Sequence, residues 1–196
     1  MITAPVGDEI LAFEAIATHT GQMPRMQVGQ RWPHIPPVGA IFLAWSSEPA
    51  REEWLTKSAS PDGGMVLDSW RKDLTLIRQG GFQIMVYEPE PSNLASLIQD
   101  LSASLSTPAS QDLVKDILSA SNSGLLHPEA LSSTTEYVVL QISAPIFGKS
   151  GAVSFSVSLS GFKERLNGAQ IGKLADRLMQ TCLEISHAEM ATSMRG

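Results

Sequence analysis

Apolar and small polar side chains alternate most strictly near the end of the chain, in residues 136–160. Serines occupy every second position of VSFSVSLS, and apolar residues fill the positions between them, namely Phe155, Val157 and Leu159. Successive side chains of a strand point to opposite faces, so this pattern predicts one apolar face and one face of hydroxyl groups. We expect two long strands, 136–147 and 151–160, joined by a turn at Gly148–Gly151.

The face of hydroxyl groups has three interpretations: it faces water, lines a pocket that holds a polar molecule, or packs under a helix or loop. A solvated sheet surface usually carries charged residues, and none stands among Ser154, Ser156, Ser158 and Ser160. The preceding strand places the uncharged residues Val139, Gln141, Ser143 and Pro145 on alternate positions. The pattern therefore favours a buried or half-buried face, and it leaves the pocket and the packed interface equally open.

Hydrophobic periods of three and four residues, with Gly and Pro between them, predict the remaining elements. In chain order, we expect strands at 10–17 and 23–28, helices at 36–47, 46–59 and 63–81, a strand at 82–88, a helical pair at 92–122, a loop at 123–134, the two long strands, and a helix at 168–189. Helices and antiparallel strands are partly segregated in this order, which indicates the α+β class.

Composition and charge exclude several classes of function and location. The 196 residues suit one domain, the net charge is −6, and Lys and Arg are scattered, so this chain alone is a poor candidate for DNA binding. Its single cysteine, Cys182, excludes an intrachain disulfide, and no signal-like segment follows Met1, which together predict a cytoplasmic protein. No apolar run approaches the length of a membrane span, so we expect no membrane association.

Motifs for catalysis or metal binding are incomplete. The GKS at 148–150 lacks the glycine that a phosphate loop needs, because Ser143 stands at that position. The SLSG at 158–161 lies within a strand pattern and lacks the features of a nucleophile elbow. The histidines have no metal-ligand spacing, Cys182 is predicted to be a packed core thiol, and the tryptophans at 45, 54 and 70 are predicted core or interface anchors. We therefore expect no catalytic residue, no metal and no cofactor.

Four segments, in order, resemble one known family. These are VGQRWPHIPPVGAIFLAW (28–45), LTLIRQGGF (74–82), ISAPIFGKSGAVSFSVSLSG (142–161) and CLEIS (182–186). They are similar to blocks of the effector-binding domain of IclR-type transcriptional regulators. The chain departs from the family pattern at Ala40, where Lys is usual, at Gly148, where Asp is usual, in the shortened spacing of RWPH, and in 92–122, which has the character of an inserted helical pair.

The resemblance implies a GAF/profilin-like fold, with an antiparallel sheet and helices, in a single effector-binding domain over 1–196. In the family a small effector binds between sheet and helices, and the contacts map here to Ser158, Ser160, Gln141, Trp32, Pro37, Val38 and Gly39. The serines would donate to an effector carboxylate or carbonyl, and N–H groups at the start of the 36–46 helix would favour an anion. Ser154 and Ser156, nearer the turn, would be solvated.

The resemblance also implies a homodimer or homotetramer. The family's N-terminal winged helix-turn-helix is absent from this sequence, so we expect contact with DNA only through such a domain, whether the chain is a fragment or a stand-alone relative. Three hypotheses remain open: a non-enzymatic sensor of a small organic acid or similar metabolite, an enzyme on the same scaffold, and an oligomerisation module whose pocket is filled by its own side chains.

Overall fold

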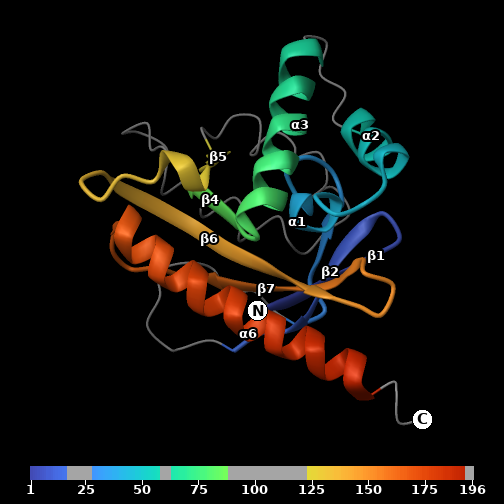
Figure 1. Ribbon diagram of the computed structural model, residues 1–196. Coiled ribbons are helices and arrows are strands. Elements are labelled where there is room, and N and C mark those ends of the chain that lie inside the picture. Colours follow the sequence, from blue (N-terminus) through green and yellow to red (C-terminus); the bar gives the residue numbers. More distant parts are fainter. Residues whose placement is uncertain (17–27, 58–62, 88–122, 193–196) are drawn as a thin grey trace.

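The computed structural model describes residues 1–16, 28–57, 63–87 and 123–192. Within them, seven strands form an antiparallel sheet in the order β3-β2-β1-β7-β6-β4-β5, and a short β8 pairs with β6 (Figure 1). The strands are β1 (Ile2–Val6), β2 (Glu9–Glu14), β3 (Arg31–Pro33), β4 (Gln83–Tyr87), β5 (Ser123–Leu125), β6 (Glu136–Phe147), β7 (Val153–Ser160) and β8 (Leu166–Asn167). The predicted α+β class with an antiparallel sheet is confirmed.

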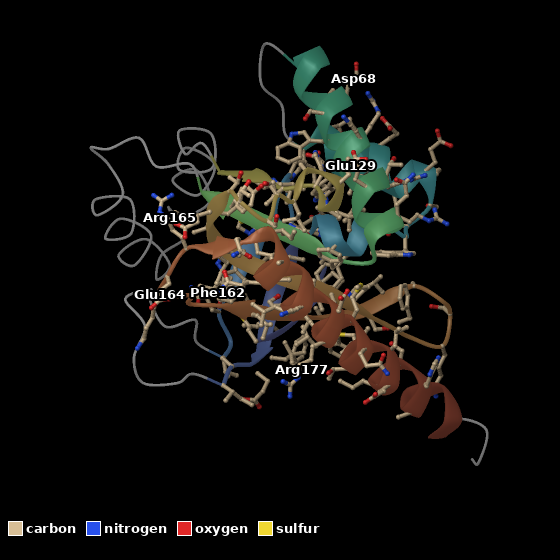
Figure 2. The ribbon with its side chains drawn as sticks, turned by 60° about the vertical axis from the view of Figure 1, so that its left-hand side comes forward. Asp68, Glu129, Phe162, Glu164, Arg165 and Arg177 are labelled. Atoms are coloured by element: carbon tan, nitrogen blue, oxygen red, sulfur yellow. The ribbon has the colours of Figure 1, made fainter. Side chains whose placement is uncertain are left out.

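Helices cover both faces of the sheet. Three of them lie on one side, α1 (Ala40–Leu43), α2 (Glu48–Thr56) and α3 (Gly63–Gly80), and the long α6 (Gly168–Thr192) crosses the other side (Figure 1). Figure 2 shows this separation through Asp68 on α3 and Arg177 on α6, which lie on opposite sides of the sheet. Each helical layer has its own hydrophobic core, one centred on α1 and one on α6.

The β6–β7 hairpin is the element that the sequence predicts best. β6 spans the predicted residues, and β7 begins at Val153, two residues later than predicted. Phe155, Val157 and Leu159 pack against the α6 core, opposite Ile146, Ala144 and Ile142. The serine face therefore points to the other side of the sheet, toward α1.

The first strands differ from the prediction. Residues 2–14 form a tight hairpin, in which β1 and β2 are joined at Gly7 and Asp8, and Gly7 has a φ of 61°. The predicted strand at 10–17 began too late and ended too late, because Gly7 turns the chain earlier with a conformation that glycine adopts without strain. Most of the predicted strand at 23–28 lies outside the described residues.

The helices predicted within the described residues are confirmed, with one correction. α1 begins at Ala40 instead of Pro36, because residues 36–39 form turns and Gly39 has a φ of 86° just before the helix. α1 is fully buried, as its apolar sequence predicts. α2, α3 and α6 lie where predicted. On α6, Ser186 is buried, whereas the neighbouring Ile185 is 40% exposed.

The segment 123–134, predicted to be a loop, contains β5 and the short helical turn η1 (Pro128–Ala130). The predicted helical pair at 92–122 lies outside the described residues.

Candidate functional site

A closed cluster of three polar side chains lies on the face of the sheet toward α1. Gln141 Nε2 donates to Ser143 Oγ at 2.7 Å and to Ser158 Oγ at 2.8 Å, and the two hydroxyl oxygens are 3.0 Å apart. Ser143 and Ser158 pair directly across β6 and β7 and are only 3% and 2% exposed. We call Gln141, Ser143 and Ser158 the polar cluster.

The four serines of β7 have different environments. Ser160, opposite Gln141, is exposed, and Ser158 belongs to the polar cluster. Ser156 is 1% exposed, and its hydroxyl has no hydrogen-bond partner among the described residues. The expectation that Ser156 is solvated is therefore wrong, and its side of β7 is the one that α1 contacts. Ser154 is half-buried beside Gly148.

The alternation along β6 breaks near Leu140. Gln141 pairs with Met85 of β4, but the next pair is Val139 with Val86, so the register shifts by one residue. The shift places Val139 in the α6 core with Ile142. Strict alternation had placed Val139 beside Gln141, and that expectation is wrong because such a bulge reverses the faces beyond it.

The predicted loop residues gather at the other end of the sheet. Trp32 on β3 pairs with Ile10 and packs, like Val38, against the α1 core, and Pro37 is buried. Gly39 lies against the ring of His34, so that a Cβ added to Gly39 would lie 2.5 Å from His34 Nε2. His34 also contacts Phe42 edge to face, with 6.3 Å between the ring centroids. This packing fixes the shape of the loop.

His34 is largely enclosed by apolar groups. Burial lowers the pKa of its imidazole, and the ion pair of Asp8 and Lys57, 2.6 Å long, lies nearby and acts on it with opposite signs. The ring atom Nε2 is buried and has no hydrogen-bond partner in the described part of the chain. The ring therefore supports the loop by packing against Gly39 and Phe42.

The predicted residues thus form two groups on the same side of the sheet. Gln141, Ser158 and Ser160 lie on β6 and β7. The other four, Trp32, Pro37, Val38 and Gly39, lie at and after β3, which β1 and β2 separate from β7. Ser143 was absent from the predicted site, although its position opposite Ser158 in the predicted hairpin was the signal that would have found it.

The start of α1 does not have the form expected for an anion site. The helix has four residues, and the N–H of Ala40 already donates to Pro37 O at 3.3 Å. A single turn aligns few peptide dipoles, so its contribution to the potential is small.

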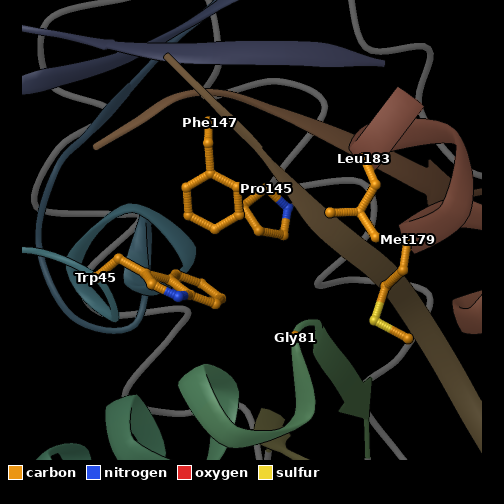
Figure 3. A pocket seen from close by; sticks show the side chains of 6 residues that line it. All are labelled: Trp45, Gly81, Pro145, Phe147, Met179 and Leu183. Carbon is orange, nitrogen blue, oxygen red and sulfur yellow. The ribbon is translucent and has the colours of Figure 1, made fainter. Parts of the chain in front are cut away.

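The structure also contains an apolar pocket that the sequence did not reveal. It has a volume of about 100 Å³ and is lined by Trp45, Gly81, Pro145, Phe147, Met179 and Leu183 (Figure 3). The lining comes from the turn after α1, the link between α3 and β4, the end of β6 and the α6 helix. Trp45 and Phe147 are in edge-to-face contact. Trp45 is therefore a wall of a pocket as well as a packing residue.

The remaining reactive or titratable side chains, Cys182, His127 and Asp73, lie in surroundings typical of residues that stabilise a fold. Cys182 is 1% exposed in the α6 core, and burial raises the pKa of its thiol to about 11. His127 Nε2 lies 3.3 Å from Asp73 Oδ1, and burial raises the pKa of that carboxyl. Within the described ranges no three His, Cys, Asp or Glu side chains come together as metal ligands, and no helix there is long and apolar enough to cross a membrane.

Comparison with known proteins identifies the fold. The sequence matches no protein-family model and no curated protein. The structure resembles the transcriptional regulator YaiJ, with a TM-score of 0.53 and 14% identity over 97% of this chain and 84% of that one. It resembles the repressor BlcR of Agobacterium tumefaciens, with a TM-score of 0.54 and 16% identity over 96% of this chain and 58% of BlcR.

A further similar structure is an IclR homolog of Microbacterium hydrocarbonoxydans, complexed with 4-hydroxybenzoate. Its TM-score is 0.55, with 16% identity over 97% of this chain and 60% of the homolog. The chain thus spans about three fifths of the length of BlcR and of this homolog. The expected likeness to IclR-type regulators is confirmed at the level of the fold, and these three matches cover 96–97% of this chain.

Proposed function

We propose that this chain is a small-molecule-sensing and oligomerisation domain of an IclR-type transcriptional regulator, acting in the cytoplasm without catalysis. It binds a small organic acid or similar metabolite on the face of the sheet toward α1, through Gln141, Ser158, Ser160 and the loop at Trp32 and Pro37–Gly39. Contact with DNA would belong to a separate domain. The likeness of fold to regulators over at least 95% of the chain carries this proposal.

The polar cluster adds support from the site itself. It places buried hydrogen-bonding groups on the central strands of the sheet, where an apolar side would otherwise be expected. Pockets for small molecules combine apolar walls with a few fixed polar groups, and Trp32 and Val38, which pack against the α1 core on the same side of the sheet, would supply apolar walls. For a regulator, the ligand must bind one quaternary state better than another.

An oligomerisation module without a ligand is the second candidate. The observation that favours it is the apolar pocket at Trp45 and Phe147, together with the exposed Leu183 and Ile185 on α6, 49% and 40% accessible. The enzyme hypothesis has less support, because His34 is enclosed and the polar cluster contains only amide and hydroxyl groups.

A thermal-melt screen against small aliphatic and aromatic acids, amides and alcohols tests the proposal. A compound present at a hundredfold over its dissociation constant stabilises the folded state by about 2.7 kcal/mol, which raises the melting temperature clearly. We expect Ser158→Ala to abolish the shift and Ser154→Ala, on the same strand, to preserve it. A shift that survives Ser158→Ala would place the ligand elsewhere, and the absence of any shift would favour the oligomerisation module.

A further inference from the structure

The polar cluster has a definite number of hydrogens to share. An amide nitrogen carries two hydrogens and each hydroxyl carries one. Gln141 Nε2 directs its hydrogens to Ser143 and Ser158, at 2.7 and 2.8 Å, and one serine donates to the other across 3.0 Å. Three hydrogen bonds therefore leave a single hydroxyl hydrogen for any further partner.

The opposite orientation of the amide would satisfy the cluster less well. If Oε1 of Gln141 faced the serines, both hydroxyls would donate to it. The two hydroxyl oxygens would then face each other at 3.0 Å with no hydrogen between them. Both serines are buried, at 3% and 2% exposure, so water would not compensate for the lost bond. The cluster therefore holds the nitrogen of Gln141 toward the serines.

This orientation determines what Gln141 offers on its free side. Its Oε1 has no hydrogen-bond partner among the described residues, and the side chain is only half-buried. An amide oxygen is purely an acceptor. The accessible end of the cluster thus requires a hydrogen-bond donor, because the one remaining serine hydrogen belongs to a buried hydroxyl.

We propose that Gln141 is the specificity-determining residue of this site, and that it selects a neutral head group with an N–H or O–H donor, such as a primary amide or an alcohol, over a carboxylate. The inference rests on the proposed function and narrows its ligand from organic acids and similar metabolites to neutral metabolites that carry a donor. A primary amide or an alcohol would donate its hydrogen to Gln141 Oε1, which lies on the half-buried side chain of the cluster. A carboxylate has no hydrogen to donate, and its oxygens would face Oε1 acceptor to acceptor.

Propionamide and propionate test this preference, because they differ only in the head group and are small enough to avoid a limit from ligand size. Each would be titrated into ¹⁵N-labelled protein, with the Gln141 side-chain NH₂ and the Ser158 backbone amide followed by NMR. We expect propionamide to bind at least fivefold more tightly than propionate. Equal or tighter binding of propionate overturns the inference and leaves the proposed function standing. If neither compound moves these signals, ligand binding at the polar cluster, and with it the proposed function, fails.

Two further measurements make the test independent of a single result. Gln141→Lys places a cation at the same position, and we expect it to reverse the preference toward propionate, whereas Ser154→Ala leaves the preference unchanged. In the ligand-free protein, the two Gln141 amide protons should exchange slowly and show nuclear Overhauser effects to the β protons of Ser143 and Ser158. Fast exchange without these effects would mean the reversed orientation, and the inference would be wrong even if Gln141→Lys does not fold.

Discussion

Ser143 and Ser158 stand directly opposite each other in the β6–β7 ladder, with hydroxyl oxygens 3.0 Å apart. Gln141 donates a hydrogen bond to each of the two serines, so that three side chains from two strands hold one another in place. A hydrogen-bonded pair at this position joins the central strands of the sheet on the side that faces α1. The arrangement is therefore both a candidate recognition element and a contribution to stability.

The coupling between the two serines is measurable. We expect Ser143→Ala and Ser158→Ala each to lower the free energy of unfolding by about 1–3 kcal/mol, because each leaves buried partners without a hydrogen bond. The double variant should lose less than the sum of the two, by at least about 0.5 kcal/mol, since the second change removes a group that is already unpaired. Urea unfolding of the four proteins gives the interaction free energy, and additive losses would show that the bond contributes nothing.

Gly39 is predicted to be intolerant of any side chain. Its φ of 86° strains an L residue, and an added Cβ would overlap the His34 ring. We expect Gly39→Ala to lower the free energy of unfolding by about 2–4 kcal/mol, the sum of strain and overlap.

Gly151→Ala is the matched control for this change. Gly151 has a similar φ of 77°, but no atom lies within 4 Å of its added Cβ. Gly151→Ala should lower the free energy of unfolding only by the cost of the left-handed backbone conformation, about 1–2 kcal/mol. Equal losses in chemical denaturation would show that the contact with His34 is relieved at no cost.

The stability of the protein should fall on mild acidification through His34. Burial lowers the pKa of His34 in the folded protein below the ordinary value of 6.5, which applies to the unfolded chain. At a pH between the folded-state and the unfolded-state pKa, the folded protein therefore binds fewer protons than the unfolded chain. The contribution of His34 is therefore complete above pH 6.5 and is lost as the pH falls through the folded-state pKa. Unfolding at a series of pH values should show a shallower slope in His34→Gln.

Asp73 changes the pH dependence of stability in the opposite direction, so its effect must be separated from that of His34. Burial raises its folded-state pKa, so its contribution is lost as the pH rises through that value. Performing the His34 comparison in an Asp73→Asn background removes this effect. An unchanged slope in His34→Gln would show that His34 does not titrate with unfolding.

Cys182 should be inert in the folded protein. Its thiol is 1% exposed and has a pKa of about 11, compared with 9.0 for a free group. The thiolate fraction at pH 8 is thus lower by about two orders of magnitude. Iodoacetamide should modify the native protein at least that much more slowly than the urea-unfolded chain. Comparable rates would mean that α6 separates readily from the sheet.

The sequence predicts elements well where one period runs uninterrupted. The β6–β7 hairpin, α2, α3 and α6 were placed correctly, because each carries a complete pattern of alternate or three- and four-residue spacing. The serine face was also assigned correctly as buried for Ser158, and Ser160 was not buried with it. Alternation gives the face of a residue, whereas burial depends on what packs above it, and α1 covers only part of β7.

The remaining differences between the predicted and the observed structure come from local backbone geometry, which the spacing of hydrophobic residues does not reveal. The register shift at Leu140 moved Val139 to the α6 side, and the turn at Gly7 divided the first residues into two strands. The hydrogen bonds from Gln141 to both serines depend on the pairing of β6 with β7. That pairing made Ser143 part of the cluster although it was not among the predicted site residues.

The two helical layers give alternate residues of one hairpin different constraints. Along β7, Phe155, Val157 and Leu159 hold the strand to the α6 core, while the residues between them face α1 and carry the hydrogen-bonding groups. A substitution at Gln141 or Ser160 can therefore change the chemistry of the site while the packing beneath it is retained. The exposed Ser160 can therefore vary with little loss of stability, whereas the buried Ser143 and Ser158, which join the two strands, are constrained by the fold as well as by any ligand.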